Sequence, residues 1–368
     1  MRVGLDIHVL TGAHQGTSSV WAYLLDALPD SHEYVLYSFD PAAVAKLYPQ
    51  PHFLHRSIPP LPAFARIQLA FPLMTRRDRC DVFHANYYGP LVGGPPLVLH
   101  VHDLIYLDFP QFSTGSRRMM FATLARASAQ AAAKVVTVSE WAKARIMNLF
   151  ALNDDAVDVV ATGLDQSWLA PAEDRIANAW REIRDKIPRR YALAVGRIDP
   201  RKNFALTARV VKTLVERGVI DGLVIVGPDD FGSSAFWNEV NADGTRGLIT
   251  HLTGLSPTTL QAVYRQASCL LYLSLAEGFG LPLIEAMAMN TPIVASNRTA
   301  IPEVAGDAAI IVDPDRFDDV VGAATSVIAD GSTRERLVAN GGRRVREFDA
   351  KLMARRMVAV YESAASRR

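Results

Sequence analysis

The chain has 368 residues, a length that suits two domains better than a single hydrophobic core. Its 49% hydrophobic and 21% charged residues exclude intrinsic disorder for the bulk of the chain. The 39 Lys and Arg against 38 Asp and Glu leave a net charge of +1, which argues against a protein that coats nucleic acid. The two cysteines, Cys80 and Cys269, lie too far apart for a disulfide scaffold or structural zinc site, and they fit a reducing cytoplasm.

The sequence also predicts a soluble protein. Asp6 interrupts the apolar start of the chain, so no signal peptide is expected. Residues 82–102 contain no Asp, Glu, Lys or Arg, but glycine and proline pairs between positions 89 and 96 would break a helix there. This stretch is therefore predicted to form strand, loop and strand rather than a membrane span.

Short apolar runs alternate with longer segments of helical periodicity, a pattern typical of parallel sheets with crossover helices. In the first half, strands are expected at residues 2–7, 34–38, 81–84, 97–101, 134–138 and 157–160. Helices are expected at residues 18–28, 116–132 and 140–150.

The second half repeats this scheme. Its expected strands are residues 191–195, 222–226, 248–252, 269–273, 292–295 and 309–312. Its expected helices are residues 204–217, 256–266, 281–289 and 316–329. A final helix with one apolar face is expected at about residues 350–364, and no strand follows it.

The predicted fold class is α/β, with two doubly wound Rossmann-like domains that face each other across a cleft. Residues 1–165 would form the N-terminal domain and residues 166–349 the C-terminal domain. Residues 350–368 would form a helix that packs back on the N-terminal domain. Because ligands of such folds bind at the carboxyl ends of the strands, the functional residues should lie just after strands.

The segment that precedes the expected helix at 281–289 combines features of a phosphate site. Gly278 and Gly280 would let the backbone approach a ligand closely, and Pro282 suits the first turn of a helix. The unpaired N–H groups at such a helix start, together with the helix dipole, attract anions. Glu277 and Glu285 would repel a phosphate, so we expect them to accept hydrogen bonds from hydroxyls of a sugar and a ribose. Alternatively, Glu285 only complements the positive helix terminus.

A second candidate segment, residues 195–203, also lies between a strand and a helix. Arg197, Arg201 and Lys202 surround a turn that contains Gly196. Arginine and lysine both bind phosphates, and two such cations could hold a diphosphate leaving group without a metal. A solvated basic turn is the alternative interpretation.

Together, these two segments resemble the nucleotide-sugar site of the family 4 retaining glycosyltransferases, which have the GT-B fold. Glu277 and Glu285 match the E-x7-E spacing of that family. Further similarity runs through residues 101–104, 137–140, 253–255 and 301–306. The resemblance covers essentially the full length of the chain.

The resemblance implies a role for each matching residue on the donor side. Arg197 and Lys202 would contact the donor diphosphate beside Gly196, Glu285 would bind the ribose, and Glu277 would lie near the hydroxyls of the transferred sugar. Backbone N–H groups in the run Gly278, Phe279, Gly280 and Leu281 would reach the phosphates or the sugar. The base would lie near Thr253, Gly254 and Leu255.

On the N-terminal side, the resemblance implies that His102 faces the reacting sugar, and Asp103 follows it and could orient its ring. The first strand–helix loop departs from the family pattern. Gly16 keeps the close backbone approach, whereas His14 or Thr17 could recognise the acceptor. This loop is not a G-x-G-x-x-G motif, so a nicotinamide site is not supported. In this family, retention is usually explained by front-side attack, in which the leaving phosphate helps to remove the acceptor's proton.

Other polar residues have simpler interpretations. His84 and His100 are expected to be buried with their ring nitrogens hydrogen-bonded. Asp313 and Asp315 match the D-x-D spacing of metal-dependent transferases, but a turn is the favoured interpretation because cations are already present near Lys202. Two basic and apolar stretches, residues 64–79 and 117–121, could contact an anionic membrane or a lipid-linked acceptor, or could be ordinary amphipathic helices.

The function predicted from the sequence is a cytoplasmic, metal-independent retaining glycosyltransferase that needs no cofactor. It would transfer a sugar from a GDP- or UDP-sugar to a hydroxyl of a glycan or lipid-linked acceptor, with mannose from GDP-mannose favoured by the resemblance to bacterial polysaccharide mannosyltransferases. It would bind no nucleic acid, and it could contact the inner face of the membrane. A nucleotide-sugar epimerase and a non-catalytic nucleotide-sugar-binding protein are the alternatives.

Overall fold

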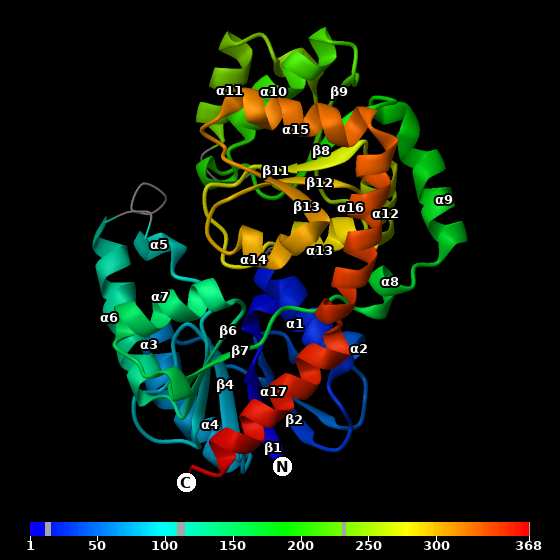
Figure 1. The fold of residues 1–368 in the computed structure, drawn as a ribbon. Coiled ribbons are helices and arrows are strands. Elements are labelled where there is room, and N and C mark those ends of the chain that lie inside the picture. Colours follow the sequence, from blue (N-terminus) through cyan, green and yellow to red (C-terminus); the bar gives the residue numbers. More distant parts are fainter. Residues whose placement is uncertain (12–15, 109–114, 230–232, 368) are drawn as a thin grey trace. The chain divides into compact units, whose positions relative to one another are not determined.

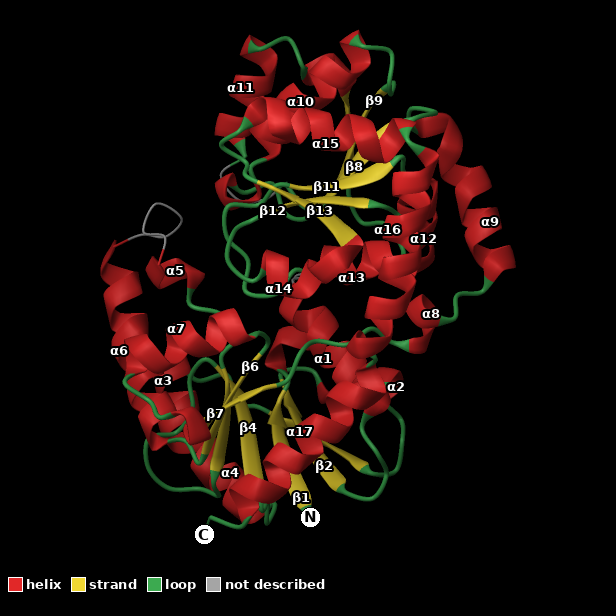
Figure 2. Cartoon of the chain, in the orientation of Figure 1, coloured by secondary structure: helices red, strands yellow, loops and turns green. Residues whose placement is uncertain are grey.

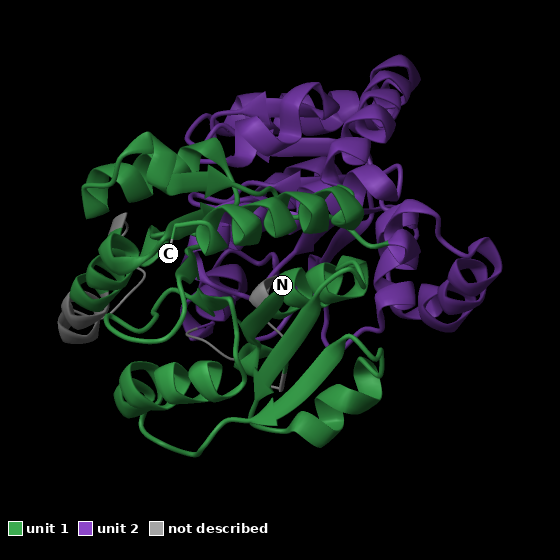
Figure 3. Cartoon of the chain, turned by 90° about the horizontal axis from the view of Figure 1, so that it is seen from below, with its two compact units in different colours: residues 1–165, 349–368 green, residues 166–348 purple. Residues whose placement is uncertain are grey.

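The computed structural model describes residues 1–11, 16–108, 115–229 and 233–367. The chain divides into two compact units, Met1–Asp165 with Asp349–Arg368, and Gln166–Phe348 (Figure 3). Each unit is a parallel sheet with helices on both faces (Figure 2). The predicted fold class is thus confirmed at the level of each unit. Within the described ranges, no helix combines the length and apolarity that crossing a bilayer requires.

The first unit contains a seven-stranded parallel sheet in the order β3-β2-β1-β4-β5-β6-β7. The strands are β1 (Arg2–Asp6), β2 (Glu33–Ser38), β3 (Phe53–Ser57), β4 (Val82–Asn86), β5 (Leu97–His100), β6 (Lys134–Thr137) and β7 (Val157–Val159). The sequence pattern does not predict β3. Its middle and end, His55 to Ser57, are polar and partly exposed, as suits a strand at the sheet edge.

Helices cover both faces of this sheet (Figure 1). They are η1 (His8–Thr11), α1 (Gly16–Ala27), α2 (Pro41–Leu47), α3 (Ala63–Ala65), η2 (Arg66–Ala70), α4 (Phe71–Arg77), α5 (Ile105–Asp108), α6 (Gly115–Ala131), α7 (Glu140–Phe150), η4 (Asp154–Ala156) and α17 (Ala350–Ala365). Phe71 and Phe150 pack on one face of the strands beside Phe83. Tyr361 of α17 lies on the opposite face, where its hydroxyl pairs with Nδ1 of His84 on β4 at 2.8 Å.

The chain re-enters the first unit at a tight backbone contact. Leu164 and Asp349 form a parallel β-bridge, and the N–H of Ala350 donates to the carbonyl of Leu164 at 2.9 Å. A Cβ on the neighbouring Gly163 would lie 2.5 Å from the carbonyl carbon of Asp349. Only glycine therefore fits where this strand meets the start of α17.

We expect Gly163→Ala to lower the free energy of unfolding by about 3 kcal/mol, because backbone atoms block its Cβ and α17 would have to shift. Urea unfolding measures the loss. Gly322→Ala within α15 (Phe317–Ala329) is the matched control, since its Cβ would meet nothing within 4 Å. That control should be neutral or should stabilise by up to about 1 kcal/mol, as alanine favours a helix over glycine. Equal stability of both variants would contradict this account.

The second unit contains a six-stranded parallel sheet in the order β10-β9-β8-β11-β12-β13. The strands are β8 (Tyr191–Val195), β9 (Gly222–Val226), β10 (Ile249–Leu252), β11 (Cys269–Tyr272), β12 (Ile293–Ser296) and β13 (Ala309–Val312). The order reverses between β8 and β11, which are neighbours in space although three strands apart in the chain. In open α/β sheets, ligands bind at the carboxyl ends of the strands at such a reversal.

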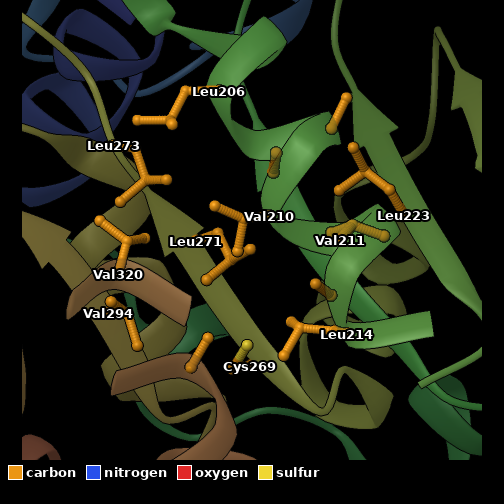
Figure 4. Packing of buried hydrophobic residues seen from close by; sticks show 14 of the residues in the cluster. Leu206, Val210, Val211, Leu214, Leu223, Cys269, Leu271, Leu273, Val294 and Val320 are labelled. Atoms are coloured by element: carbon orange, nitrogen blue, oxygen red, sulfur yellow. The ribbon is translucent and has the colours of Figure 1, made fainter. Parts of the chain in front are cut away.

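Helices again flank the sheet. The remaining ones are α8 (Gln166–Leu169), α9 (Glu173–Ile183), η5 (Arg184–Lys186), η6 (Pro200–Lys202), α10 (Phe204–Glu216), α11 (Ser234–Ala242), η7 (Arg246–Leu248), α12 (Pro257–Gln266), α13 (Leu281–Ala288), α14 (Ile301–Ala305), η8 (Gly306–Ala308), α16 (Gly331–Arg344) and η9 (Val345–Phe348). Figure 4 shows Leu206, Val210 and Leu214 of α10 packed against Leu271 and its neighbours on the sheet. This rigid core positions the loops that follow β8 and β11.

Candidate functional site

The cationic turn after β8 is held by its own side chains. Asp199 caps the single turn of η6, because its Oδ1 accepts a hydrogen bond from the N–H of Arg201 at 2.7 Å. Asn203 ends the turn with a left-handed φ of 55°, and its Nδ2 donates to the carbonyl of Leu273 at 3.3 Å. The turn is thereby fixed to the segment that follows β11.

Gly196 allows the Lys202 side chain to lie along the backbone of this turn. Its φ is +143°, and a Cβ added there would lie 2.8 Å from Cε of Lys202. Gly227, after β9, is equally constrained, since its Cβ would lie 2.1 Å from the Gly196 carbonyl oxygen. Gly227 thus lets the ends of β8 and β9 approach each other, and Gly196 leaves room for the buried Lys202 side chain.

The loop after β11 leads into α13 through a turn of glycine and proline residues. Gly280 precedes the helix with a φ of +112°, and Pro282 occupies its first turn. Among the residues that the structure describes, no side chain caps the start of α13 with a hydrogen bond. The first N–H groups of this eight-residue helix and the positive end of its dipole therefore favour an anion there.

The structure brings the turn and the loop into direct contact. The N–H of Leu275 donates to the carbonyl of Arg201 at 2.8 Å, and Nη1 of Arg201 donates to the carbonyl of Ala276 at 2.8 Å. Glu277 joins both cations, since its Oε1 accepts from Lys202 Nζ at 2.6 Å and its Oε2 from Arg201 Nη1 at 2.7 Å. We call Arg201, Lys202 and Glu277 the charged triad.

The carboxylate of the charged triad is ionised at neutral pH. Burial by itself raises the pKa of the Glu277 carboxyl, but the adjacent Arg201 and Lys202 outweigh it and lower that pKa to about 2. Burial lowers the pKa of Lys202, and the Glu277 carboxylate opposes that change. Nζ of Lys202 also lies 5.1 Å from the centre of the Tyr272 ring. Two cations share one carboxylate, so the triad carries one net positive charge.

Glu285 has a different environment one turn inside α13. Its Oε2 accepts a hydrogen bond from the hydroxyl of Tyr264 on α12 at 2.7 Å. Burial raises the pKa of the Glu285 carboxyl to about 7, against the opposing effects of Tyr264 and Lys202. The two glutamates of the E-x7-E spacing therefore differ in pKa, because among the described residues Glu277 has cations in hydrogen-bond contact whereas Glu285 has the Tyr264 hydroxyl.

The raised pKa of Glu285 predicts a pH-dependent stability that Glu285→Gln removes. The folded-state pKa lies above the ordinary 4.5, so the stabilisation is complete below pH 4.5 and is lost as the pH rises through 7. The shift corresponds to about 3 kcal/mol. Between pH 4 and pH 8, urea unfolding of the parent protein should lose about 3 kcal/mol more than the variant does. An identical pH dependence would contradict the buried carboxyl.

Other predicted donor residues follow β8, β10 and β11 of the same sheet, outside the charged triad. Arg197 is partly buried in the loop after β8. Thr253 and Gly254 are exposed after β10, and Leu255 is partly buried beside them. Gly278 and Phe279 are buried between Glu277 and α13, where Phe279 meets the Phe348 ring edge-on at 5.6 Å. The roles of these residues stay predictions.

In the first unit, His102 forms part of a histidine stack with His84 and His100. Ring centres of His84 and His100 lie 5.5 Å apart, and those of His100 and His102 lie 4.0 Å apart. All three are buried, and burial lowers the pKa of His102 to about 4, so its ring is neutral at physiological pH. His84 and His100 are buried as expected, but the expectation of fully hydrogen-bonded rings is wrong, because their Nε2 atoms have no hydrogen-bonding partner among the described residues.

The acceptor-side candidates are only partly visible. Gly16 begins α1, whereas His14 and the side chain of Thr17 lie outside the described residues. Asp103 accepts a hydrogen bond from the N–H of Ile105 at 3.2 Å, which caps the start of α5. Its predicted effect on His102 stays a prediction.

Asp313 and Asp315 form a turn that one arginine closes. Nη2 of Arg298 donates to Oδ1 of Asp313 at 2.9 Å and to Oδ2 of Asp315 at 2.6 Å, and Asp313 also accepts from the N–H of Asp315. Among the residues that the structure describes, no group of three or more His, Cys, Asp and Glu is arranged to hold a metal ion. Both carboxylates are thus engaged in holding the turn.

Two polar residues of the site have no signal in the sequence. Tyr264 reaches Glu285 from a different helix, and Thr299 accepts a hydrogen bond from the N–H of Glu277 at 2.8 Å. Thr299 has a φ of 52°, a left-handed conformation that is strained for a β-branched residue. Neither belongs to a local motif, so only the packing of α12 and the segment after β12 reveals them.

Comparisons with known proteins match both halves of the chain. The family described as Glycosyltransferase Family 4 matches residues 14–168, and Glycosyl transferases group 1 matches residues 178–344. MMP α-(1→4)-mannosyltransferase of Mycolicibacterium hassiacum is 30% identical over 84% of this chain and 76% of its own length. O-antigen chain mannosyltransferase B of Escherichia coli is 27% identical over 71% of this chain and 70% of its own length.

Solved structures share the architecture at lower identity. Sucrose-phosphate synthase of Thermosynechococcus elongatus superposes with a TM-score of 0.78 at 18% identity, over the whole of both chains. HepE of Anabaena, solved in complex with UDP, superposes with a TM-score of 0.76 at 15% identity, over 98% of this chain and 99% of that one. At such identities the likeness concerns the fold alone, which for both is GT-B.

Proposed function

The chain belongs to glycosyltransferase family 4, and from that premise we propose that it transfers mannose from GDP-mannose to a hydroxyl of a glycan or lipid-linked acceptor, with retention of configuration. That it is a glycosyltransferase follows from its family. The donor, the acceptor and the stereochemistry form the proposal. The mannosyltransferases of Escherichia coli and Mycolicibacterium hassiacum support the choice of sugar.

The charged triad at the amide-rich start of α13 is the observation that carries the proposal. A diphosphate leaving group carries about two negative charges, and one cation 4 Å away contributes about 4 kcal/mol per charge pair at an effective dielectric of about 20. The triad supplies one net positive charge, and Arg197 on the same turn would add a second. Such fixed charges stabilise a leaving group as its bond to the sugar breaks.

The two glutamates divide the recognition of the donor. Glu277 is ionised, with a pKa of about 2, so it accepts hydrogen bonds from sugar hydroxyls and does not act as a general acid. Glu285, whose burial raises its pKa to about 7, would accept hydrogen bonds from the ribose, and those donors would favour its ionised form. A neutral His102 would contact the reacting sugar from the first unit, as the family resemblance implies.

We further propose that the transfer needs no metal ion. Arg201 and Lys202 would supply the positive charge that a metal ion otherwise gives a diphosphate, and Arg298 engages the D-x-D pair considered above, Asp313 and Asp315. Transfer activity should therefore persist in a chelator.

Isothermal titration with GDP-, UDP-, ADP- and dTDP-sugars tests the donor without an acceptor. We expect GDP-mannose to bind most tightly. Incubation of the preferred donor with and without oligosaccharide or polyprenyl-linked acceptors then tests the reaction, and NMR of the product gives the anomeric configuration. Tighter binding of another nucleotide sugar would show that GDP-mannose is not the donor. A sugar isomer formed without an acceptor would identify an epimerase.

A further inference from the structure

Large apolar side chains are exposed together in one region of the first unit. Among the described residues, eight large hydrophobic residues are exposed, and six of them belong to two neighbouring segments. These six, which we call the apolar patch, are Leu61, Phe64, Leu69, Leu73, Leu91 and Val92. Leu69 is 63% exposed, Leu73 67% and Val92 77%. Such a concentration marks an interaction surface rather than scattered surface residues.

Hydrogen bonds and close packing join the two segments. The first is residues 61–77, which end in the continuous helical stretch of α3, η2 and α4, and the second is the loop at residues 89–94. Gln68 fastens this loop, because its Nε2 donates to the carbonyl of Gly89 at 3.1 Å and its Oε1 accepts from the N–H of Leu91 at 2.9 Å. A Cβ on Gly93 would lie 3.6 Å from Cβ of Pro72. The apolar patch is therefore one surface.

The fold does not need the outward leucines of the patch. The inner face of the helical stretch is occupied by Ile67 and Phe71, which pack into the core of the first unit. Leu69 and Leu73 lie one turn apart on the outer face, where they gain no comparable burial. Two exposed leucines on one helical face, beside four further exposed apolar side chains, are typical of an interaction surface.

The surroundings of the patch are basic. Residues 61–94, which contain both segments, include four Arg and two Asp, a net charge of +2 in a chain whose total is +1. Arg76, Arg77 and Arg79 are exposed at the end of α4. Of the two acids, Asp78 is engaged by Arg56 at 3.0 Å and by the hydroxyl of Tyr37 at 2.9 Å.

A second aromatic residue extends this surface. Phe39, which is also exposed, lies beneath the guanidinium of Arg66, whose Cζ is 5.1 Å from the ring centre. Arginine over an apolar ring at the edge of an apolar surface suits a boundary between hydrocarbon and water.

An apolar patch of this kind fits either a second copy of the chain or a lipid bilayer, and the charge around the patch distinguishes these two partners. A second copy of the chain related by two-fold symmetry would place the same arginines against each other, which opposes association. The surface of an anionic bilayer offers hydrocarbon for the leucines and phosphates for the arginines. We propose that the apolar patch docks the first unit onto an anionic lipid bilayer, with Leu69 and Leu73 inserted below the headgroups. The proposal rests on the proposed function only in that a lipid-linked acceptor would be met at this surface.

Vesicle sedimentation tests the proposal. The full-length protein should bind vesicles of phosphatidylglycerol and phosphatidylcholine at least about tenfold more tightly than vesicles of phosphatidylcholine alone, and added salt should weaken that binding. The double variant Leu69→Glu/Leu73→Glu should lose about tenfold or more of the binding. Leu47→Glu is the matched control, since Leu47 is also 67% exposed but lies on α2, across the first unit from α3 in Figure 1, and it should bind as the parent does.

Two further measurements test whether the double variant is folded and whether the patch mediates self-association instead. Calorimetric titration with the preferred nucleotide should give the same affinity for the parent and the double variant, which shows that the variant is folded and separates this proposal from the proposed donor chemistry. Equal binding of the parent to both kinds of vesicle, or unchanged binding of the double variant, would overturn the proposal. A parent dimer that the double variant dissociates, measured by light scattering, would assign the patch to self-association and would overturn it as well.

Discussion

The Lys202→Ala variant should bind nucleoside diphosphates about ten- to a hundredfold more weakly than the parent and should unfold with about 3 kcal/mol less free energy. Lys202 is buried, and its ammonium lies 2.6 Å from the Glu277 carboxylate, so its removal leaves a buried charge that only Arg201 still neutralises. Isothermal titration with GDP and urea unfolding measure the two effects.

Lys212→Ala is the matched control, because Lys212 lies on α10 of the same unit and donates to the carbonyl of Asp243 at the surface. It should leave both the affinity and the stability within measurement error. If Lys202→Ala lowers stability and leaves nucleotide affinity unchanged, the lysine has a structural role alone and the diphosphate site lies elsewhere.

Glu277→Gln should reduce the turnover of sugar transfer about a hundredfold or more, while the affinity for the free nucleoside diphosphate does not fall. The amide keeps the shape of the side chain but removes the only carboxylate that contacts both Lys202 and Arg201 among the described residues. Lys202 and Arg201 then no longer pair with a carboxylate, so no side-chain charge at position 277 competes with the diphosphate for them. Steady-state kinetics and calorimetry on the same preparation compare the two quantities.

Glu335→Gln on the exposed face of α16 serves as the control and should match the parent in both assays. Equal losses of turnover and nucleotide affinity in Glu277→Gln would instead place Glu277 at the nucleotide. Because glutamine preserves the volume of the side chain, such a result would not reflect a cavity.

The alternation of apolar runs and helical segments was sufficient to predict both sheets. Strands of parallel sheets are buried on both faces, so they appear as continuous apolar runs such as Tyr191–Val195 and Gly222–Val226. The strand β3 does not follow this rule, because it lies at the edge of the sheet, where polar residues such as His55 and Arg56 are partly exposed. The sequence pattern also does not predict the helix α16, because most of its residues are polar and two glycines, Gly341 and Gly342, lie within it.

Local sequence alone therefore determined the fold class, the family and the two segments that carry the candidate site, because glycines, prolines and charges at strand ends act over a few residues. Only the tertiary structure decided which groups meet: that Glu277 lies between Lys202 and Arg201, and that Tyr264 reaches Glu285. Those contacts join residues 21 to 76 positions apart. Burial raises the pKa of Glu285, whereas the contacts with Arg201 and Lys202 lower the pKa of Glu277. Burial and pairing are properties of packing, so no short motif contains them.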